Sequence, residues 1–433
     1  MLKKYIILGY IEGIGGWQVY ENLKVGYLQK NGWDVSVLSY PSLEYDSEKV
    51  ILDNLIPYKN NIFIELKFPI SSLTKKQINN VLERIDNTLN IYSNKYDEIV
   101  IETGALYLVT WGEFLAQRYK SKHFLFLLHS YYNMQSPEMF KFLDFKYNRG
   151  ELAVHYQNSM KELFQPYKEF PISDHCVLSA SITHTLGEDS IDYAKILKKD
   201  CYDYVIGSIG WLVKEYIPSM SKDVISFAKK HPDKKFLFIV IGSSSGEVVE
   251  KELLKIAEGV KNLELRLMGA MFPIPRALVK CMDICIGSFS SARIADQEGV
   301  KTILMVDDSI TPLGIMGYTL TKWPYDVCRD YKGSVYDLLE DIIDKKICEK
   351  LQYIPPVIDD DVDSLFEKHI QKLNESCNKK EYYNVLPLNK KNITKSILYR
   401  LETSLSKVIG IRNTLYPLTI RASFKQQLNK IRK

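Results

Sequence analysis

The stretch "KKYIILGYIEGIGGWQVYENLKVGYLQKNGWDVSVLS", residues 3–39, contains the pattern that decides the fold of this chain. An apolar run over residues 4–9 predicts a buried strand, and a glycine-rich loop follows it. Residues 17–30 repeat apolar side chains at a spacing of four, which predicts a helix that ends at an Asn-Gly pair. Residues 33–39 predict the next strand. Strand, loop, helix and strand in this order are typical of a parallel βαβ unit.

The same alternation continues along the chain in two series. Further strands are predicted near residues 98–101 and 123–128, and "YVIGSIG", "KFLFIVIG", "LELRLMG", "DICIGS" and "TILMVD" form a second series. A chain of 433 residues is too long for one ordinary core. The predicted fold class is therefore α/β, with two Rossmann-like domains facing across a cleft. We expect the first domain over residues 1–190, the second over residues 191–350, and a helical extension with a basic tail over residues 351–433.

The composition is that of a globular protein without a metal or disulfide framework. Hydrophobic residues make up 46% of the chain and charged residues 25%. The seven cysteines lack CxxC spacing and the seven histidines are scattered, so we expect reduced thiols and no metal site. The acidic run "DDDVD", residues 359–363, is better explained as a helix start than as a metal site. No long apolar run and no secretory signal is recognisable, so we expect a cytoplasmic protein.

The glycine-rich loop over residues 12–16 has three interpretations. A dinucleotide-binding fingerprint needs a glycine three residues beyond Gly15, where this chain has Gln18, and no acidic residue closes the second strand. The dinucleotide interpretation is therefore disfavoured. A tight turn without a ligand stays open. So does a loop in which Gly15 and Gly16 let a sugar or phosphate approach bare backbone and a helix N-terminus.

Two polar residues follow predicted strands of the first domain. Ligands of open parallel sheets bind beyond the carboxyl ends of the strands. Glu102 stands at such an end, either as a base or sugar-binding carboxylate or as a solvated loop residue. His129 directly follows an apolar strand, either as a structural histidine or as a group facing the interdomain cleft. Glu102 and His129 are the candidate catalytic residues.

The first strand end of the second domain carries residues that suit a diphosphate. In "GSIGWLVK", residues 207–214, the candidates for this contact are Ser208, Gly210 and Lys214. A plain strand-to-helix loop is the alternative.

A later strand end offers a second candidate for anion binding. In "GSFSSARIADQEG", residues 287–299, hydroxyl-bearing residues run directly into a predicted helix. Ser288, Ser290 and Ser291 either form an anion site at the helix N-terminus or simply cap the helix. The loop "GSSSG", residues 242–246, is a weaker candidate of the same type.

The order of these elements resembles that of a GT-B-fold glycosyltransferase, most closely the family-four enzymes of bacterial polysaccharide biosynthesis. "GGWQVYENLKVGYLQKNGWDVSVL" is similar to the opening of that family, and "YDEIVIETG" and "FLFLLHS" resemble its middle strands. "VLSASIT" resembles the end of its first domain. "YVIGSIGWLVKEY", "KFLFIVIGSSSG" and the run from Leu263 to Ile303 follow the order of its nucleotide-binding domain. His129 stands where the family has a histidine beside the donor sugar.

Three positions depart from the pattern of the family. Where the family has an arginine and a lysine after the first strand of its nucleotide-binding domain, this chain has Trp211 and Tyr216, with Lys214 nearby. Where the family has a glutamate that holds the ribose, this chain has Ile294. The neighbouring candidates for that role are Arg293, Asp296 and Glu298.

The resemblance implies an activity. The chain would transfer a sugar from a nucleotide-sugar to a saccharide or lipid-linked saccharide acceptor in surface polysaccharide synthesis. It would need no cofactor and no metal, because a helix dipole and basic residues stabilise the departing diphosphate. Two alternatives stay open: a sugar-nucleotide epimerase on the same fold, and a catalytically weak partner subunit of an active transferase, which Trp211 and Ile294 favour.

The C-terminal tail differs electrostatically from the rest of the chain. Residues 390–433 hold eleven basic residues and one acid, Glu402, a net charge of +10 in a chain whose total is +4. The tail either packs on the second domain or attaches to an anionic membrane, where each basic residue adds about 1 kcal/mol. Nucleic-acid binding is not indicated, since no recognised motif accompanies the charge. We expect a protein that is peripheral at the inner face of the cell membrane.

Overall fold

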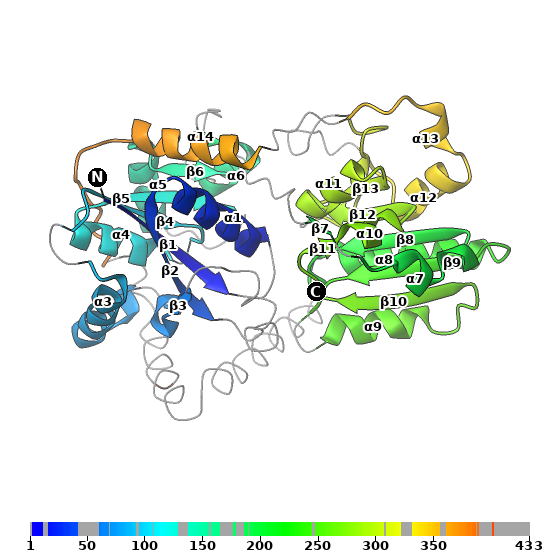
Figure 1. The fold of residues 1–433 in the computed structure, drawn as a ribbon, viewed down its shortest axis with the longest axis horizontal. Helices are drawn as coiled ribbons and strands as arrows, with labels where there is room; N and C mark the ends of the chain where they lie inside the picture. The colour runs from blue at the N-terminus through cyan, green and yellow to red at the C-terminus, as the bar shows by residue number, and fades with distance from the viewer. Residues whose placement is uncertain are drawn as a thin grey trace. The chain divides into compact units, whose positions relative to one another are not determined.

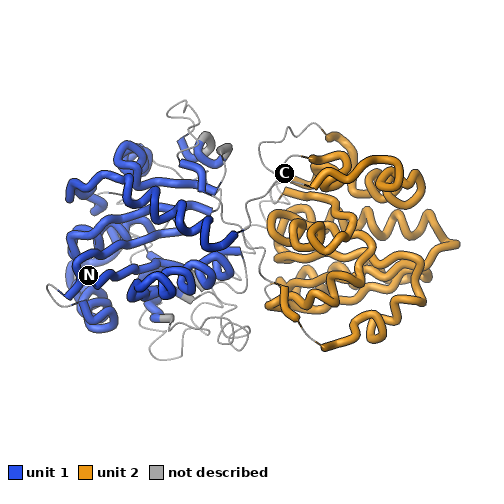
Figure 2. The backbone as a smooth tube through the Cα atoms, turned by 45° about the horizontal axis from the view of Figure 1, so that its top comes forward, with its two compact units in different colours: residues 1–180, 361–433 blue, residues 181–360 orange. Residues whose placement is uncertain are grey.

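The computed structural model divides the chain into two compact units (Figure 2). Unit 1 comprises residues 1–180 and 361–433, and unit 2 comprises residues 181–360. The chain thus leaves unit 1, forms unit 2 and returns to unit 1. The described residues are 2–11, 16–41, 60–68, 70–91, 95–106, 108–128, 137–155, 157–164, 176–178, 186–188, 190–244, 247–306, 309–321, 331–355, 361–386, 388 and 401.

Unit 1 is built on a six-stranded parallel sheet (Figure 1). Its first strand, β1 (Lys3–Ile11), lies in the middle and is buried on both faces over residues 5–8. This is what a near-continuous apolar run predicts. The strand order is β3-β2-β1-β4-β5-β6, with β2 at Trp33–Pro41, β3 at Asn60–Ile62, β4 at Glu98–Thr103, β5 at Lys122–Leu127 and β6 at Leu152–Val154.

Helices connect the strands of unit 1. The helix predicted after the glycine-rich loop is α1 (Gly16–Lys30). In α3 (Lys75–Leu89), a capping box explains the start, because Thr74 and Gln77 each accept a hydrogen bond from the backbone of the other. The remaining helices are α4 (Val109–Tyr119), α5 (Pro137–Asn148) and α6 (Gln157–Phe164), with 3-10 turns at Ile64–Lys67 and Ile70–Ser72.

The helix α14 (Val362–Glu375) packs against α1 (Figure 1). Asp361 caps it by accepting a hydrogen bond of 2.9 Å from a backbone N–H of the first turn, so the acidic run does start a helix. The ring of Phe366 lies 5.6 Å from that of Tyr20 on α1. The sequence pattern groups residues 351–433 into one extension, whereas the structure assigns residues 361–433 to unit 1. The segment joins unit 1 because the apolar face of α14 is buried there, against α1.

Unit 2 contains a second six-stranded sheet in which five strands are parallel. Its strand order is β10-β9-β8-β12-β13-β14, and β14 (Gly314–Ile315) is antiparallel. A separate pair joins β7 (Leu186–Gly187) to β11 (Ile274–Pro275). The other strands are β8 (Tyr204–Ile209), β9 (Phe236–Ile241), β10 (Leu263–Gly269), β12 (Ile284–Ser288) and β13 (Lys301–Met305).

Each face of the unit 2 sheet carries its own apolar core, because alternate strand residues point to opposite sides. Ile206 and Phe238 belong to a core with α8, α9 and α12, whereas Val205 and Leu237 belong to a core with α7, α10 and α11. These helices are α7 (Tyr193–Leu197), α8 (Tyr216–Lys230), α9 (Val248–Ala257), α10 (Arg276–Lys280), α11 (Phe289–Gln297) and α12 (Val335–Ile343); α13 (Ile347–Lys350) and a 3-10 turn (Lys199–Cys201) complete the unit.

Both sheets place their first strand in the middle and the fourth beside it, which is the order of a Rossmann-like fold. The predicted fold class, α/β with two Rossmann-like units, is confirmed. Within the described part of the chain, no helix combines the length and the apolar character needed to cross a bilayer.

Candidate functional site

Each sheet has one topological switch point, the place where the strand order reverses. It lies between β1 and β4 in unit 1 and between β8 and β12 in unit 2. Connections leave the two neighbouring strands toward opposite faces there, so a crevice forms outside their carboxyl ends. Three of the residues predicted from the sequence stand on these strands: Glu102 on β4, Ser208 on β8 and Ser288 on β12.

Four residues converge at the switch point of unit 2, and we call them the strand-end cluster: Gly210, Lys214, Tyr216 and Ser288. Nζ of Lys214 donates a hydrogen bond of 2.7 Å to Oγ of Ser288, and the hydroxyl of Tyr216 lies 3.4 Å from the same oxygen. Gly210 has a φ of 150°, which favours glycine. A Cβ at Gly210 would lie 3.6 Å from both Lys214 Nζ and Tyr216 OH. Bare backbone, an ammonium group and two hydroxyls therefore share one small space.

The strand-end cluster adjoins the N-terminus of α11, where the amide groups and the helix dipole favour negative charge. Ser288 is the N-cap residue, yet its side chain makes no capping hydrogen bond. The hydroxyl of Ser291 donates a hydrogen bond of 2.6 Å to the backbone carbonyl of Ser288. Ser290, which lies between these two residues in the sequence, is half-buried. The Phe289 ring centroid lies 5.7 Å from Lys214 Nζ, a cation–π distance. A fixed cation beside a helix N-terminus suits an anion.

Ser208 lies deeper in the same sheet. Its side chain is buried, and within the described residues its hydroxyl has no hydrogen-bond partner. It stands on β8 two residues before Gly210 and is paired with Ile286 of β12. The hydroxyl is therefore a polar group close to the strand-end cluster rather than part of it.

The three candidates for ribose binding lie further along α11. Arg293 is buried, and Asp296 accepts a hydrogen bond of 2.9 Å from the hydroxyl of Tyr353. Burial raises the pKa of the Asp296 carboxyl. Glu298 follows the helix end, about 15 Å along the axis from Ser288. It forms ion pairs with basic residues of α10, and the structure does not bring it to the cluster.

In the glycine- and serine-rich loop after β9, the described residue Ser244 is hydrogen-bonded to residues of α9. The backbone N–H of Ser244 donates 2.6 Å to Oε1 of Glu250, and the hydroxyl of Ser244 accepts 3.2 Å from the backbone of Val249. The carboxylate of Glu250 thus takes the place that an external anion would take at the start of α9.

The switch point of unit 1 is filled by the indole of Trp17, which is buried in the first turn of α1. A Cβ at Gly104, directly after β4, would overlap this indole, and a Cβ at Gly9 of β1 would lie 3.0 Å from its Nε1. These two glycines therefore leave room for a tryptophan. Gly16 is the exposed first residue of α1, and Gly15 lies outside the described residues.

Glu102 is fully buried in an ion pair with Lys24 of α1. Its Oε1 accepts 2.9 Å from Tyr20 OH, and its Oε2 accepts 2.5 Å from Tyr5 OH. Burial lowers the pKa of Lys24, and burial together with the Glu102 charge raises the pKa of Tyr5. Both carboxylate oxygens therefore already have donors inside unit 1. His129 lies outside the described residues.

Sequence reasoning missed two residues of these sites. One is Tyr216, which stands where the resembled family has a lysine. Its hydroxyl lies beside Lys214 and Ser288, so the departure from the family pattern was the signal that could have identified it. Lys24 follows Tyr20 by one helical turn on the buried side of α1, which is the signal of a paired buried charge.

In the part of the chain that the structure describes, no three His, Cys, Asp or Glu residues are grouped so as to hold a metal ion. Independence from metal stays a prediction, to be tested on activity.

No family model and no curated protein matches this sequence. Solved structures do match its fold. HepE of Anabaena, solved in complex with UDP and glucose, is 13% identical with a TM-score of 0.50, over 97% of this chain and 99% of that chain. A glycosyltransferase from Rickettsia africae is 12% identical with a TM-score of 0.47, over 97% of each chain. The UDP-GlcNAc 2-epimerase of Neisseria meningitidis, solved with UDP-GlcNAc, is 12% identical with a TM-score of 0.47, over 87% of this chain and 100% of that chain.

The likeness to HepE shows the class of fold, which is GT-B, with two Rossmann-like α/β units in one chain. At 13% identity the likeness concerns the fold. Membership of the family-four glycosyltransferases stays a prediction.

Proposed function

We propose that this chain is a glycosyltransferase that binds the diphosphate of a nucleotide-sugar at the strand-end cluster of unit 2. The observation that carries the proposal is the 2.7 Å contact between Lys214 Nζ and Ser288 Oγ beside the N-terminus of α11. When the sugar leaves, negative charge builds up on the diphosphate. A preorganised ammonium group, hydroxyls and a helix terminus stabilise that charge without a metal ion.

The contrast between the two switch points supports this choice of unit. Trp17 fills the crevice of unit 1, and Lys24 is neutralised by Glu102. In unit 2, Lys214 is half-buried and its ammonium group donates to the hydroxyl of Ser288 at the end of β12. HepE, which shares the fold, was solved with UDP and glucose, and this makes a nucleotide-sugar the donor to test first.

The acceptor in this proposal is a saccharide or lipid-linked saccharide of surface polysaccharide synthesis. The basic residues 390–433 would hold the protein at the inner face of an anionic membrane, close to a lipid-linked acceptor. His129 remains the proposed group at the reacting sugar. Glu102 enters as a positioning group, because its carboxylate is buried and already paired.

The test uses the purified full-length chain with a panel of UDP-, GDP- and CMP-sugars. A bound ligand raises the melting temperature, because it stabilises the folded state by mass action. We expect stabilisation by a nucleoside-diphosphate sugar, followed by nucleotide release that depends on an acceptor. Interconversion of the sugar without an acceptor would show an epimerase instead. Binding without turnover would show a partner subunit, and no stabilisation by any donor would contradict the proposed site.

A further inference from the structure

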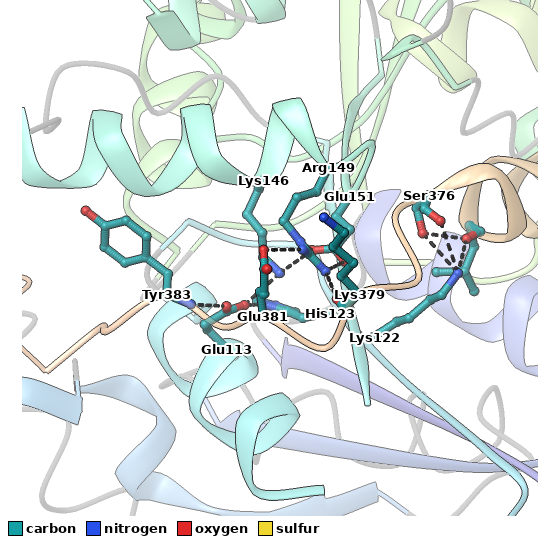
Figure 3. Close-up of polar contacts among 11 residues, drawn as sticks. Glu113, Lys122, His123, Lys146, Arg149, Glu151, Ser376, Lys379, Glu381 and Tyr383 are labelled. Atoms are coloured by element: carbon teal, nitrogen blue, oxygen red, sulfur yellow. Dashed lines mark hydrogen bonds and ion pairs between the residues drawn. The ribbon is translucent and has the colours of Figure 1, made fainter. Parts of the chain in front are cut away.

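The C-terminal strap, residues 361–386, is hydrogen-bonded to β5 and to the connection between α5 and β6 of unit 1. It consists of α14 and the segment that follows. Nζ of Lys122 donates 2.9 Å to the carbonyl of Leu373, and the guanidinium of Arg149 donates 2.5 Å to the carbonyl of Lys379 (Figure 3). The chain reaches this surface only after it has formed unit 2. The strap therefore joins the end of the chain to a sheet formed near its beginning.

One polar relay runs from α14 to the end of β4. Nδ1 of His369, on α14, lies 3.3 Å from Nζ of Lys24. An ammonium group has no lone pair, so Lys24 donates and His369 accepts. Lys24 also pairs with Glu102, the next-to-last residue of β4, and all three side chains are buried.

A second relay starts at the other part of the strap (Figure 3). The backbone N–H of Tyr383 donates 2.8 Å to Oε1 of Glu113, and Oε2 of Glu113 lies 2.8 Å from Nδ1 of His123. Since a carboxylate only accepts, Nδ1 carries the proton and Nε2 accepts. Nε2 lies 2.6 Å from Oγ1 of Thr103, the last residue of β4, so the Thr103 hydroxyl donates to it. Gly112 makes this possible, because a Cβ there would overlap His123 and Thr103.

Charge balance holds the second relay in place. Nζ of Lys146 lies 2.7 Å from a carboxylate oxygen of Glu113 and 2.7 Å from one of Glu151. Arg149 completes the group by donating 3.0 Å to Glu151. Removing one member would leave an uncompensated buried charge, which is strongly destabilising.

The carboxylate, histidine and hydroxyl of Glu113, His123 and Thr103 follow the order of a hydrolase triad. Thr103 and Glu113 are 0% exposed and His123 is 1% exposed, so no substrate reaches the hydroxyl. The arrangement therefore positions a strand end and does not supply a nucleophile.

We propose that the strap positions the end of β4 for the reaction through these two relays. They start from different parts of the strap and meet at consecutive residues, Glu102 and Thr103. These residues end β4 at the switch point of unit 1, directly before Gly104 and the indole of Trp17. His369, Glu113 and His123 are thus positioning residues. The effect on turnover rests on the proposed function, whereas the effect on β4 does not.

The test breaks each relay in the full-length chain and reads two quantities. Thr103→Val removes the hydroxyl that ends the relay through His123. His369→Gln removes the imidazole that accepts from Lys24 in the other relay. We expect hydrogen exchange of the backbone amides of residues 102–105 to accelerate by about tenfold or more in both variants. We expect kcat to fall by about tenfold or more with KM for the donor unchanged, because the donor binds unit 2. Thr103→Ser, which keeps the hydroxyl, should restore both.

Ser376→Ala is the matched control. It removes the contact of 3.2 Å from Lys122 to the strap, which does not lead to the end of β4. Unchanged exchange at residues 102–105 in both relay variants would overturn the proposal, and so would an equal effect of Ser376→Ala. If Thr103→Val does not fold, His369→Gln decides alone. A wild-type chain that turns over no nucleotide-sugar contradicts the proposed function only, since the exchange measurement still decides the role of the strap.

Discussion

The ammonium nitrogen of Lys214 lies 2.7 Å from the hydroxyl oxygen of Ser288, although the two residues are 74 positions apart in the sequence. The contact exists because β8 and β12 are neighbours in the sheet and both end at the same edge. It places a cation at the switch point, next to a helix N-terminus, where the departing diphosphate of a sugar donor needs compensation.

Replacing Lys214 by methionine should weaken nucleotide binding. The variant loses a charge-assisted hydrogen bond, so we expect the Kd for the best nucleoside diphosphate to rise about 10- to 100-fold. Isothermal titration of the folded variant measures this. Lys222→Met, which removes an exposed lysine from α8, is the control and should bind like the wild type. Equal affinity of the wild type and both variants would show that Lys214 does not bind the nucleotide.

Activity should survive a chelator. The proposed stabilisation of the leaving group relies on Lys214, hydroxyls and the start of α11, so a divalent ion is not required. Nucleotide release in excess EDTA, compared with release in added manganese, measures the dependence. Loss of turnover in EDTA that manganese restores would contradict this prediction.

Gly104→Ala should destabilise unit 1, because the added methyl group would overlap the indole of Trp17. Overpacking of this kind lowers the free energy of unfolding by about 1–3 kcal/mol. Urea unfolding followed by circular dichroism measures the change. Gly26→Ala is the matched control: nothing lies within 4 Å of its Cβ position on α1, so it should be neutral or stabilising. A Gly104→Ala variant as stable as the wild type would show that Trp17 does not fill the crevice.

The free energy of unfolding should fall below about pH 6.5, near the ordinary pKa of histidine. Burial and the charge of Lys146 lower the pKa of His123. In this pH range His123 therefore binds a proton in the unfolded chain but not in the folded chain. The stabilisation is therefore fully present above the unfolded pKa and is lost as the pH falls through the window toward the folded pKa. It falls by at most about 1.4 kcal/mol per pH unit.

A carboxyl group, that of Glu113, contributes to the stability in the same direction at lower pH. Although burial opposes it, the hydrogen bond from His123 and the charge of Lys146 lower the pKa of Glu113 to about 2. Urea unfolding at pH 7.5 and 5.5 isolates the histidine part. His123→Gln should flatten the difference, whereas His231→Gln, in unit 2, should keep it. A wild-type difference that persists in His123→Gln would show that another group causes it.

Truncation after Leu388 should leave unit 1 folded and release the protein from anionic vesicles. The cut keeps the C-terminal strap and removes all eleven basic residues of 390–433. Truncation after Asp360 also removes the strap and should lower the melting temperature, because α1 loses the apolar face of α14, and the buried side chains of Lys24 and Glu113 each lose a hydrogen-bond partner. Co-sedimentation at low salt measures attachment. Equal binding by the full chain and the Leu388 truncation would contradict attachment through the tail.

The sequence by itself determined the two α/β units and the strand ends at which binding residues are expected. Runs such as residues 4–9 and 33–39 became β1 and β2, and "DDDVD" became a helix start, because hydrophobic periodicity and capping are local properties. The serine-rich run before α11 could likewise be identified as a strand end leading into a helix.

Only the tertiary structure decided which side chains meet. It paired Lys214 with Ser288, filled the space between Gly9 and Gly104 with Trp17, and buried Glu102 against Lys24. It also returned residues 361–386 to unit 1, where the pattern alone suggests a separate extension. The physical reason is that the hydrophobic periodicity of a segment indicates whether a residue is buried, but not which residues it packs against. Its partner depends on strand order and on the path of a chain that crosses between units, and both arise from contacts far apart in the sequence.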